Sequence, residues 1–527
     1  MEGYHWGRFT SGSWSQALWL VLMPFGLVNA AQFMLDPPST TVAKAGHAVA
    51  GAMLRLIGLA LTVLIVLCAA VAAMDLWAWQ FVGPREGFAA FPYDLVPLAA
   101  LLAPAAALLV CNFLGRARLV GGRDEDDAEP SVRKQRDDRL RHVPDAAGAG
   151  MPGEFWTQDL PSDLARPGFF GGDPDAPALR LLHIAAGLLV LAALGYAPAG
   201  PAPDVAPPWA LGLTLAVLAV VVLVVVLLGD PEESASVDVG PGRLKRLKDL
   251  FHKRADLLAT VLAGVGGAAF VLAAVRVTAL PPVPAGEPHW PGIDAAVFAA
   301  LCAGIGGLAV LAVANVVVLY EERRSRAREN PDFAPYAGGF AATLVTALGL
   351  FVGVGYTGAF ATAAAQLLDT WGGGSGGGSV RVPELFSRIV HSWGVTTALI
   401  VLVAAVGALV WRAQRSGFLE RAREQYLRDG EQDPRVPKRW LGHIAFGMWK
   451  ARLKTHLVGP LALFTGVGAL LSAFTVAELW PQLWGGQPQR LPGWLDALSQ
   501  SQSYGGPATG WCSGPGRSRS PGWPARS

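Results

Sequence analysis

One apolar run limits what this chain can fold into. Residues Trp209 to Gly229, WALGLTLAVLAVVVLVVVLLG, contain no charged side chain and little hydrogen-bonding capacity apart from Thr214. A helix of about 20 such residues rises roughly 30 Å, the thickness of the hydrocarbon core of a bilayer. Several other runs have the same character. The sequence therefore predicts an all-α, polytopic transmembrane helical bundle.

The composition agrees with a lipid environment. Hydrophobic residues make up 52% of the 527 residues and charged residues only 16%, whereas soluble domains average about 25% charged residues. The cysteines are scattered, and no two have the spacing of a thiolate metal site. We expect them to serve as small hydrophobic packing residues rather than as disulfides or metal ligands. They are Cys68, Cys111, Cys302 and Cys512.

Hydropathy predicts nine strong spans and one weak N-terminal run. The weak run, Gln16–Met34, contains Pro24, Gly26 and Asn29. It could be a true span, a re-entrant or interfacial segment, or a signal peptide; its interrupted middle slightly favours the re-entrant interpretation. The nine strong spans are Ile57–Leu76, Leu95–Leu114, Leu179–Tyr196, Trp209–Gly229, Leu257–Ala279, Ala295–Tyr320, Gly338–Ala363, Trp393–Trp411 and Leu457–Leu479.

The loops alternate between basic and non-basic. Pro198–Pro208 and Leu280–Ile293 contain no Lys or Arg, whereas Arg116–Arg166 and Arg412–Lys454 are rich in them. Short basic loops stay cytoplasmic. The pattern predicts a multi-pass protein of the cell membrane, with its basic loops in the cytoplasm and its C-terminus outside.

The same features divide the chain into segments. An N-terminal segment and two spans precede a polar cytoplasmic loop, and six spans precede a second, basic loop with amphipathic helices. One last span and a Gly-, Pro- and Ser-rich tail follow. The tail is expected to be disordered, and its change of character near Ser503 is explained either by out-of-frame translation or by a natural disordered tail. The segments are 1–55, 56–115, 116–177, 178–411, 412–455, 456–480 and 481–527.

One basic stretch suggests contact with lipid headgroups. The segment RLKRLKDLFHKR places leucines and a phenylalanine on one helical face and cations on the others. Such a helix can lie on an anionic membrane surface. The alternative is that these cations only enforce topology. The candidate headgroup-binding residues are Lys245, Arg246, Lys248, Lys253 and Arg254.

Small residues recur inside the spans. Gly264, Gly266 and Gly267 are echoed by a similar AGxGG pattern forty residues later, and Gly349 and Gly353 form a GxxxG motif. Such residues let membrane helices approach closely. We expect them to pack helices within the chain, and they also allow a homo-oligomer. Membrane lipids are the expected partners, nucleic acid is not, and no protein partner can be named.

Two segments match parts of known motifs but lack the sequence context that those motifs require. Gly373–Gly377 has the letters of G-x-S-x-G but lies in a flexible linker and follows no buried strand. The acidic run Asp124–Asp127 lacks the ligand spacing of a calcium loop. Arg55, Asp75 and His183 fall near the ends of predicted spans, so no proton- or sodium-coupled pump is expected. We assign no catalytic residue, no cofactor and no metal ligand from the sequence.

The N-terminal segment EGYHWGRFTSGSWSQALWLVLMPFGLVNAAQFML, Glu2 to Leu35, resembles large polytopic membrane proteins of actinobacteria. In some of these a lipase-like α/β-hydrolase is split around the bundle. The resemblance implies that this chain is the membrane portion of such a protein, without either hydrolase piece, so no catalytic residue carries over. It also implies a cytoplasmic N-terminus and one more helix after Leu479.

Three functions follow as expectations. The leading one is a membrane anchor or scaffold without chemistry of its own, the membrane part of a hydrolase-like protein if the resemblance holds. An uncoupled transporter or channel is the alternative, and polar residues converging on one cavity would favour it. An enzyme built on residues 154–176 is the third, and it would need Asp159, Asp163 and Asp173 to converge with His142 or Arg166.

Overall fold

The computed structural model describes most of the predicted helices. The described residues are 18–35, 38, 40–83, 95–114, 176–198, 209–228, 243–279, 289–326, 336–371, 380–428, 431–432 and 438–456. These residues are almost entirely helical. A two-residue ladder, β1 (Leu427–Arg428) with β2 (Glu431–Gln432), is the only strand pairing among them, with Leu427 opposite Gln432. The all-α prediction is confirmed.

Within the described residues, seven helical segments are long and apolar enough to cross a membrane. The first is α4 (Thr41–Ala70) continued by the π-helix η2 (Val71–Val82). The others are α5 (Leu95–Leu114), α8 (Ala176–Tyr196), α9 (Trp209–Leu227), α13 (Ala341–Trp371) and the apolar parts of α11 (Arg243–Val277) and α12 (Ile293–Arg326). The protein is therefore membrane-embedded by length and composition.

The prediction of nine spans is not confirmed. The expected span Trp393–Trp411 lies within α14 (Glu384–Tyr426), which is not one of the seven, and Leu457–Leu479 lies outside the described residues. The weak N-terminal run forms a 3-10 turn, η1 (Leu18–Leu22), and the short helix α3 (Met23–Gln32). Its described apolar helix is too short to span a bilayer alone.

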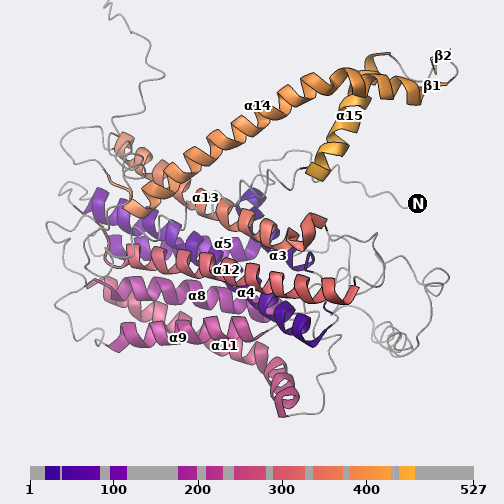
Figure 1. Cartoon of the computed structure of the whole chain (residues 1–527). Helices are drawn as coiled ribbons and strands as arrows, with labels where there is room; N and C mark the ends of the chain where they lie inside the picture. The colour runs from indigo at the N-terminus through magenta and orange to yellow at the C-terminus, as the bar shows by residue number, and fades with distance from the viewer. Residues whose placement is uncertain are drawn as a thin grey trace, which may run out of the picture.

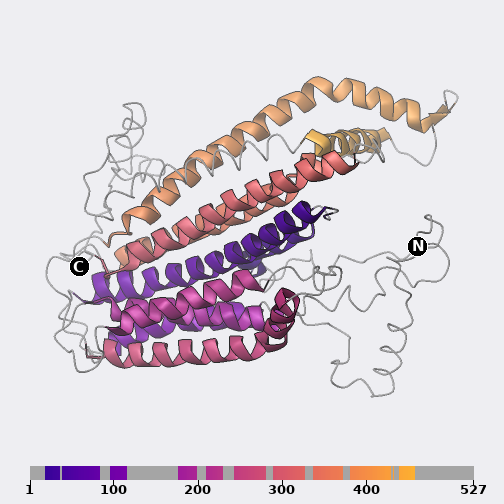
Figure 2. The same ribbon diagram turned by 60° about the horizontal axis from the view of Figure 1, so that its bottom comes forward.

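Helix α4 lies at the centre of the bundle (Figures 1 and 2). It starts where the Thr40 side chain accepts a hydrogen bond from the backbone N–H of Ala43 at 3.1 Å, an N-cap that satisfies one free donor. It packs most extensively on α12 and also contacts α3, α5, α8, α9 and α13. Helix α9 lies at the periphery; Val220, Leu223 and Leu227 are exposed there, as lipid-facing residues would be.

Contacts at glycines define the helix directions. Val318 of α12 meets Gly46 of α4, and Ile57 meets Gly307, so these two helices are antiparallel. Ala185 of α8 meets Gly266 of α11, and Ala273 meets Gly195, so α8 and α11 are parallel. These directions are the ones that alternating loops require. One end of the bundle, here called the Thr41 end, carries the start of α4; the other, the Asp75 end, carries η2.

The expected small-residue packing holds at some glycines and not at others. Gly304 approaches Leu350, and Gly349 approaches the backbone of Pro24, each closely enough to need glycine. Around Gly264, Gly267 and Gly306 nothing lies within 4 Å of a would-be methyl group. Small residues therefore build the seams α11–α8, α12–α4, α12–α13 and α13–α3, while other glycines of the same motifs face outward.

The last described elements leave the bundle. In Figures 1 and 2, α14 runs obliquely away from α13 and α15 (Lys438–His456) folds back along its far half. Trp411 and Phe418 of α14 pack there with Ala445 and Trp449 of α15. The first turns of α11 also bend away from the bundle axis. The predicted basic helix is thus continuous with α11, but only Arg254 among its candidate cations has a described side chain, which is exposed.

Candidate functional site: a buried carboxylate and a polar cavity

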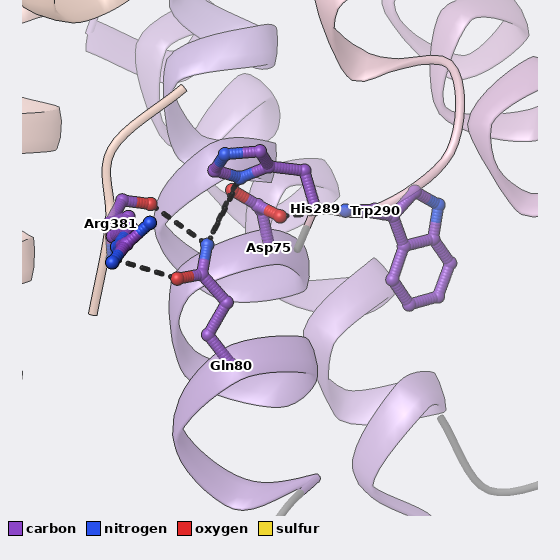
Figure 3. Close-up of polar contacts among 5 residues, drawn as sticks. All are labelled: Asp75, Gln80, His289, Trp290 and Arg381. Carbon is purple, nitrogen blue, oxygen red and sulfur yellow. Dashed lines mark hydrogen bonds and ion pairs between the residues drawn. The ribbon is translucent and has the colours of Figure 1, made fainter. Parts of the chain in front are cut away.

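Asp75 lies in the interior of the bundle with no exposed surface. The sequence placed it near the end of a predicted span, whereas the helix continues past it to Val82. Its Oδ1 accepts the backbone N–H of Trp290 at 2.7 Å, and its Oδ2 lies 3.0 Å from Nδ1 of His289. A buried carboxylate is costly unless its oxygens are satisfied. Here both oxygens have partners from the segment that precedes α12 (Figure 3).

Gln80 extends this network to a second segment. Its side-chain amide donates to Oδ2 of Asp75 at 3.1 Å and to the carbonyl of Arg381 at 2.9 Å, and its oxygen accepts the N–H of Arg381 at 2.8 Å. The amide thus pairs with the Arg381 backbone much as a neighbouring strand would (Figure 3). Asp369 supports the same segment by accepting the N–H of Val380 at 2.9 Å.

The π-helix makes the pairing of Asp75 with Gln80 geometrically feasible. In an α-helix, residues five apart point about 140° away from each other, whereas π-type i→i+5 bonds bring them onto one face. Segment Val71–Val82 is wound as a π-helix throughout. The aromatic side of the same segment packs inward, where Trp79 meets the ring of Trp290 edge-on at 5.2 Å. Trp290 also donates from Nε1 to the carbonyl of Leu194 at the end of α8.

His289 is the titratable partner of this carboxylate. The hydrogen bond to Asp75 is the main cause that raises the pKa of His289 above its usual value, and the charges of Asp75 and Asp294 add to it. Burial and the nearby Arg381 act in the opposite direction. A protonated imidazole here donates to the carboxylate in a charge-assisted hydrogen bond. Asp75, Gln80, His289, Trp290 and Arg381 therefore join η2 to the ends of α8, α12 and α14. We call these five residues the Asp75 clamp.

A cavity of about 730 Å³ opens toward the Thr41 end. Helices α3, α4, α5 and α8 line it, mostly with apolar side chains. Several polar side chains also converge on it. They are Asn29, Gln32, Arg55, Thr62, Asn112, Arg180 and His183.

Two of these polar residues differ from expectation. Arg55 is buried, since α4 starts fourteen residues earlier than the arginine and neighbouring helices cover it. His183 lies inside α8, with Nδ1 at 2.6 Å from Oγ1 of Thr62. Both were expected near span ends, where a long side chain reaches the interface. Their spacing in the sequence could not predict that Arg55 and His183 line one cavity, because that depends on the packing of α4 on α8.

The other candidate residues from the sequence lie outside the described residues or form no site. The residues of the 154–176 enzyme hypothesis, including Asp159 and His142, lie outside the described residues, as do Gly373–Gly377 and Asp124–Asp127. Cys68, Cys111 and Cys302 are unbonded thiols. In the part of the chain that the structure describes, no group of His, Cys, Asp or Glu is placed to hold a metal ion.

Together the seven apolar helices, the buried clamp and the cavity define an integral membrane helical bundle. Compared with known proteins, the chain matches no protein family, no curated protein and no solved structure. The resemblance to actinobacterial membrane proteins with a split hydrolase therefore stays a prediction.

Proposed function

We propose that this protein is a multi-pass scaffold of the plasma membrane, a rigid bundle that holds its connecting segments in fixed positions. The Asp75 clamp carries the proposal. One buried side chain and its neighbour Gln80 hold Trp290 and Arg381, which belong to two different connections between spans. A bundle that had to open and close at this end would break these hydrogen bonds, of which the one between Trp290 and Asp75 is buried, in each cycle.

Charge distribution supports an orientation for the scaffold. Among the described bundle residues, cations outnumber acids toward the Thr41 end, where Lys44, Arg55, Arg180, Arg254 and Arg323 lie with Asp256, Glu321 and Glu322. Acids outnumber cations toward the Asp75 end, where Asp75, Asp294, Asp369 and Glu384 lie with Arg276, Arg381 and Arg388. Positive charge is retained on the cytoplasmic side of membranes. In this proposal the Thr41 end faces the cytoplasm and the Asp75 clamp faces the outside.

The cavity favours a second function, uncoupled transport of a solute. Polar residues from four helices converge on it, which is typical of a transport site. Its described lining stops near Val66 and Leu22, well short of the clamp. A transporter would have to open a further route past the π-helix.

Reconstitution of the full chain in liposomes separates the two functions. A scaffold should remain in the membrane after an alkaline carbonate wash, while encapsulated sodium, chloride and a small dye leak no faster than from empty liposomes. Efflux of one solute above that of empty liposomes would overturn the scaffold proposal in favour of transport. Release of the protein by carbonate would overturn both.

A further inference from the structure

Arg55 and Arg180 lie at the same level on two neighbouring helices. Helices α4 and α8 run parallel, since Gly58 meets the ring of His183 and Val66 meets Gly187 one to two turns further along. Arg55 precedes Gly58 by three residues, and Arg180 precedes His183 by three. Residues three apart share a helix face. Both arginines also line the same cavity, so two cationic side chains border one space at its Thr41 end.

The cavity changes character along its length. Asn112 and the hydrogen-bonded pair His183–Thr62 follow the arginines, and beyond them the walls consist of residues such as Ile65, Val66 and Leu108. The lining residues of α4 run from Leu54 to Val66, which corresponds to about 18 Å at 1.5 Å per residue. That length is slightly more than half of a hydrocarbon core of about 30 Å. The space is thus polar where the arginines, Thr62 and His183 lie and apolar beyond them, and its two parts together extend over slightly more than one leaflet.

We infer that this cavity binds a phosphate-bearing amphiphile, with the phosphate at Arg55 and Arg180 and the acyl chain along α4 toward Val66. Guanidinium groups bind phosphate oxygens through paired, charge-assisted hydrogen bonds. The volume of about 730 Å³ falls in the range of sites for one small ligand, about 300–1,000 Å³. It suits one acyl chain with its headgroup. This site is separate from the scaffold role, which depends on the opposite end of the bundle.

Native mass spectrometry of the detergent-purified full chain tests the site with three probes. These are 1-oleoyl lysophosphatidic acid, monooleoylglycerol, which has the same chain without phosphate, and inorganic phosphate, which has no chain. We expect one saturable adduct of the lysophosphatidic acid per chain, and at least about tenfold weaker binding of the other two, because each lacks one half of the recognised ligand.

Matched variants locate the adduct. Arg55→Gln/Arg180→Gln should weaken lysophosphatidic acid binding by about tenfold or more, while Arg323→Gln, at an exposed arginine toward the same end, should leave it unchanged. Ile65→Trp should reduce the same affinity by filling the apolar part, whereas Leu213→Trp, exposed on α9, should not. If the double variant fails to fold, Arg180→Gln alone is used, because that side chain is only half-buried.

Each remaining outcome overturns the inference. Absence of any adduct means that the space is closed or filled by the protein itself. Equal binding of monooleoylglycerol removes the role of the arginines. Equal binding of inorganic phosphate removes the role of the apolar walls. An adduct that survives Arg55→Gln/Arg180→Gln unchanged lies elsewhere on the bundle.

Discussion

Asp75 and Gln80 share one face of their helix although they are five positions apart, and the Gln80 amide donates to the Asp75 carboxylate at 3.1 Å. The π-type winding of this segment brings the two side chains together and turns them toward two different connections of the bundle. π-Helical segments are rare and often mark functional positions. The clamp is therefore the place where small substitutions should have large effects.

Asp75→Leu should destabilise the protein by several kcal/mol, on the order of 1–3 kcal/mol for each buried polar group left without a partner. It removes the acceptor of the Trp290 N–H and of His289. Asp75→Asn should cost less because an amide oxygen can still accept from Trp290. The midpoint of thermal aggregation in detergent, followed by size exclusion, measures the effect. Asp256→Asn, an exposed acid on α11, is the control, and a loss as large there would contradict the role of the clamp.

The stability of the clamp should fall as the pH rises. The pKa of His289 is raised in the folded protein, so its contribution is complete below the unfolded value of about 6.5 and is lost as the pH passes through the higher folded value. Thermal midpoints measured from pH 5.5 to 8.5 should decline over the upper part of this range. His289→Gln should flatten the decline, while His443→Gln, exposed on α15, should leave it in place. A decline that persists in His289→Gln would assign it to another group.

Gln80→Leu should loosen the segment around Arg381. It removes both hydrogen bonds between the amide and the Arg381 backbone, leaving the segment attached through Asp369 and Val380. Trypsin should then cleave after Arg381 faster than in the parent protein, severalfold in initial rate. The matched control is Gln414→Leu, an exposed glutamine of α14. Equal cleavage rates in the two variants would show that Gln80 does not hold the segment.

Gly355→Ala should displace Trp393 from α13. A methyl group at Gly355 would overlap the indole, which stacks on Phe351 with ring centroids 4.5 Å apart and donates to the Phe351 carbonyl. We expect a loss of stability of about 1–3 kcal/mol from this overpacking. Gly264→Ala, where nothing lies within 4 Å, should be neutral or stabilising because alanine favours helix. Equal midpoints for the two variants would contradict the close approach.

Cysteine labelling tests the proposed orientation. In a chain without its four natural cysteines, Arg381→Cys lies at the Asp75 end and Arg323→Cys toward the Thr41 end; both positions are exposed. A membrane-impermeant maleimide applied to intact cells should label the first and not the second, because basic loops are retained inside. The opposite labelling pattern would invert the topology, and labelling of both would require a different number of spans.

The sequence by itself was enough to predict that lipid surrounds this protein and where most of its helices lie. Runs such as Leu95–Leu114 and Leu179–Tyr196 coincide with helices α5 and α8 to within a few residues, because a predominantly apolar run of about twenty residues has few alternatives to a membrane helix. The ends of the helices were harder to predict from the sequence. Hydropathy marks the lipid boundary, whereas α4 begins before the predicted span and η2 continues beyond it, so Asp75 appeared to be a terminal residue.

Only the tertiary structure decided which polar residues meet. Asp75 contacts Trp290, which is 215 positions away in the sequence, and Thr62 contacts His183, which is 121 positions away. Both contacts depend on helix packing that no local pattern encodes. The π-winding that aligns Asp75 with Gln80 has no recognised signature in VAAMDLWAWQFV. Hydrophobicity is a property of each residue in turn and can be read along the chain. A clamp or a cavity exists only between segments, and its formation depends on how their surfaces pack.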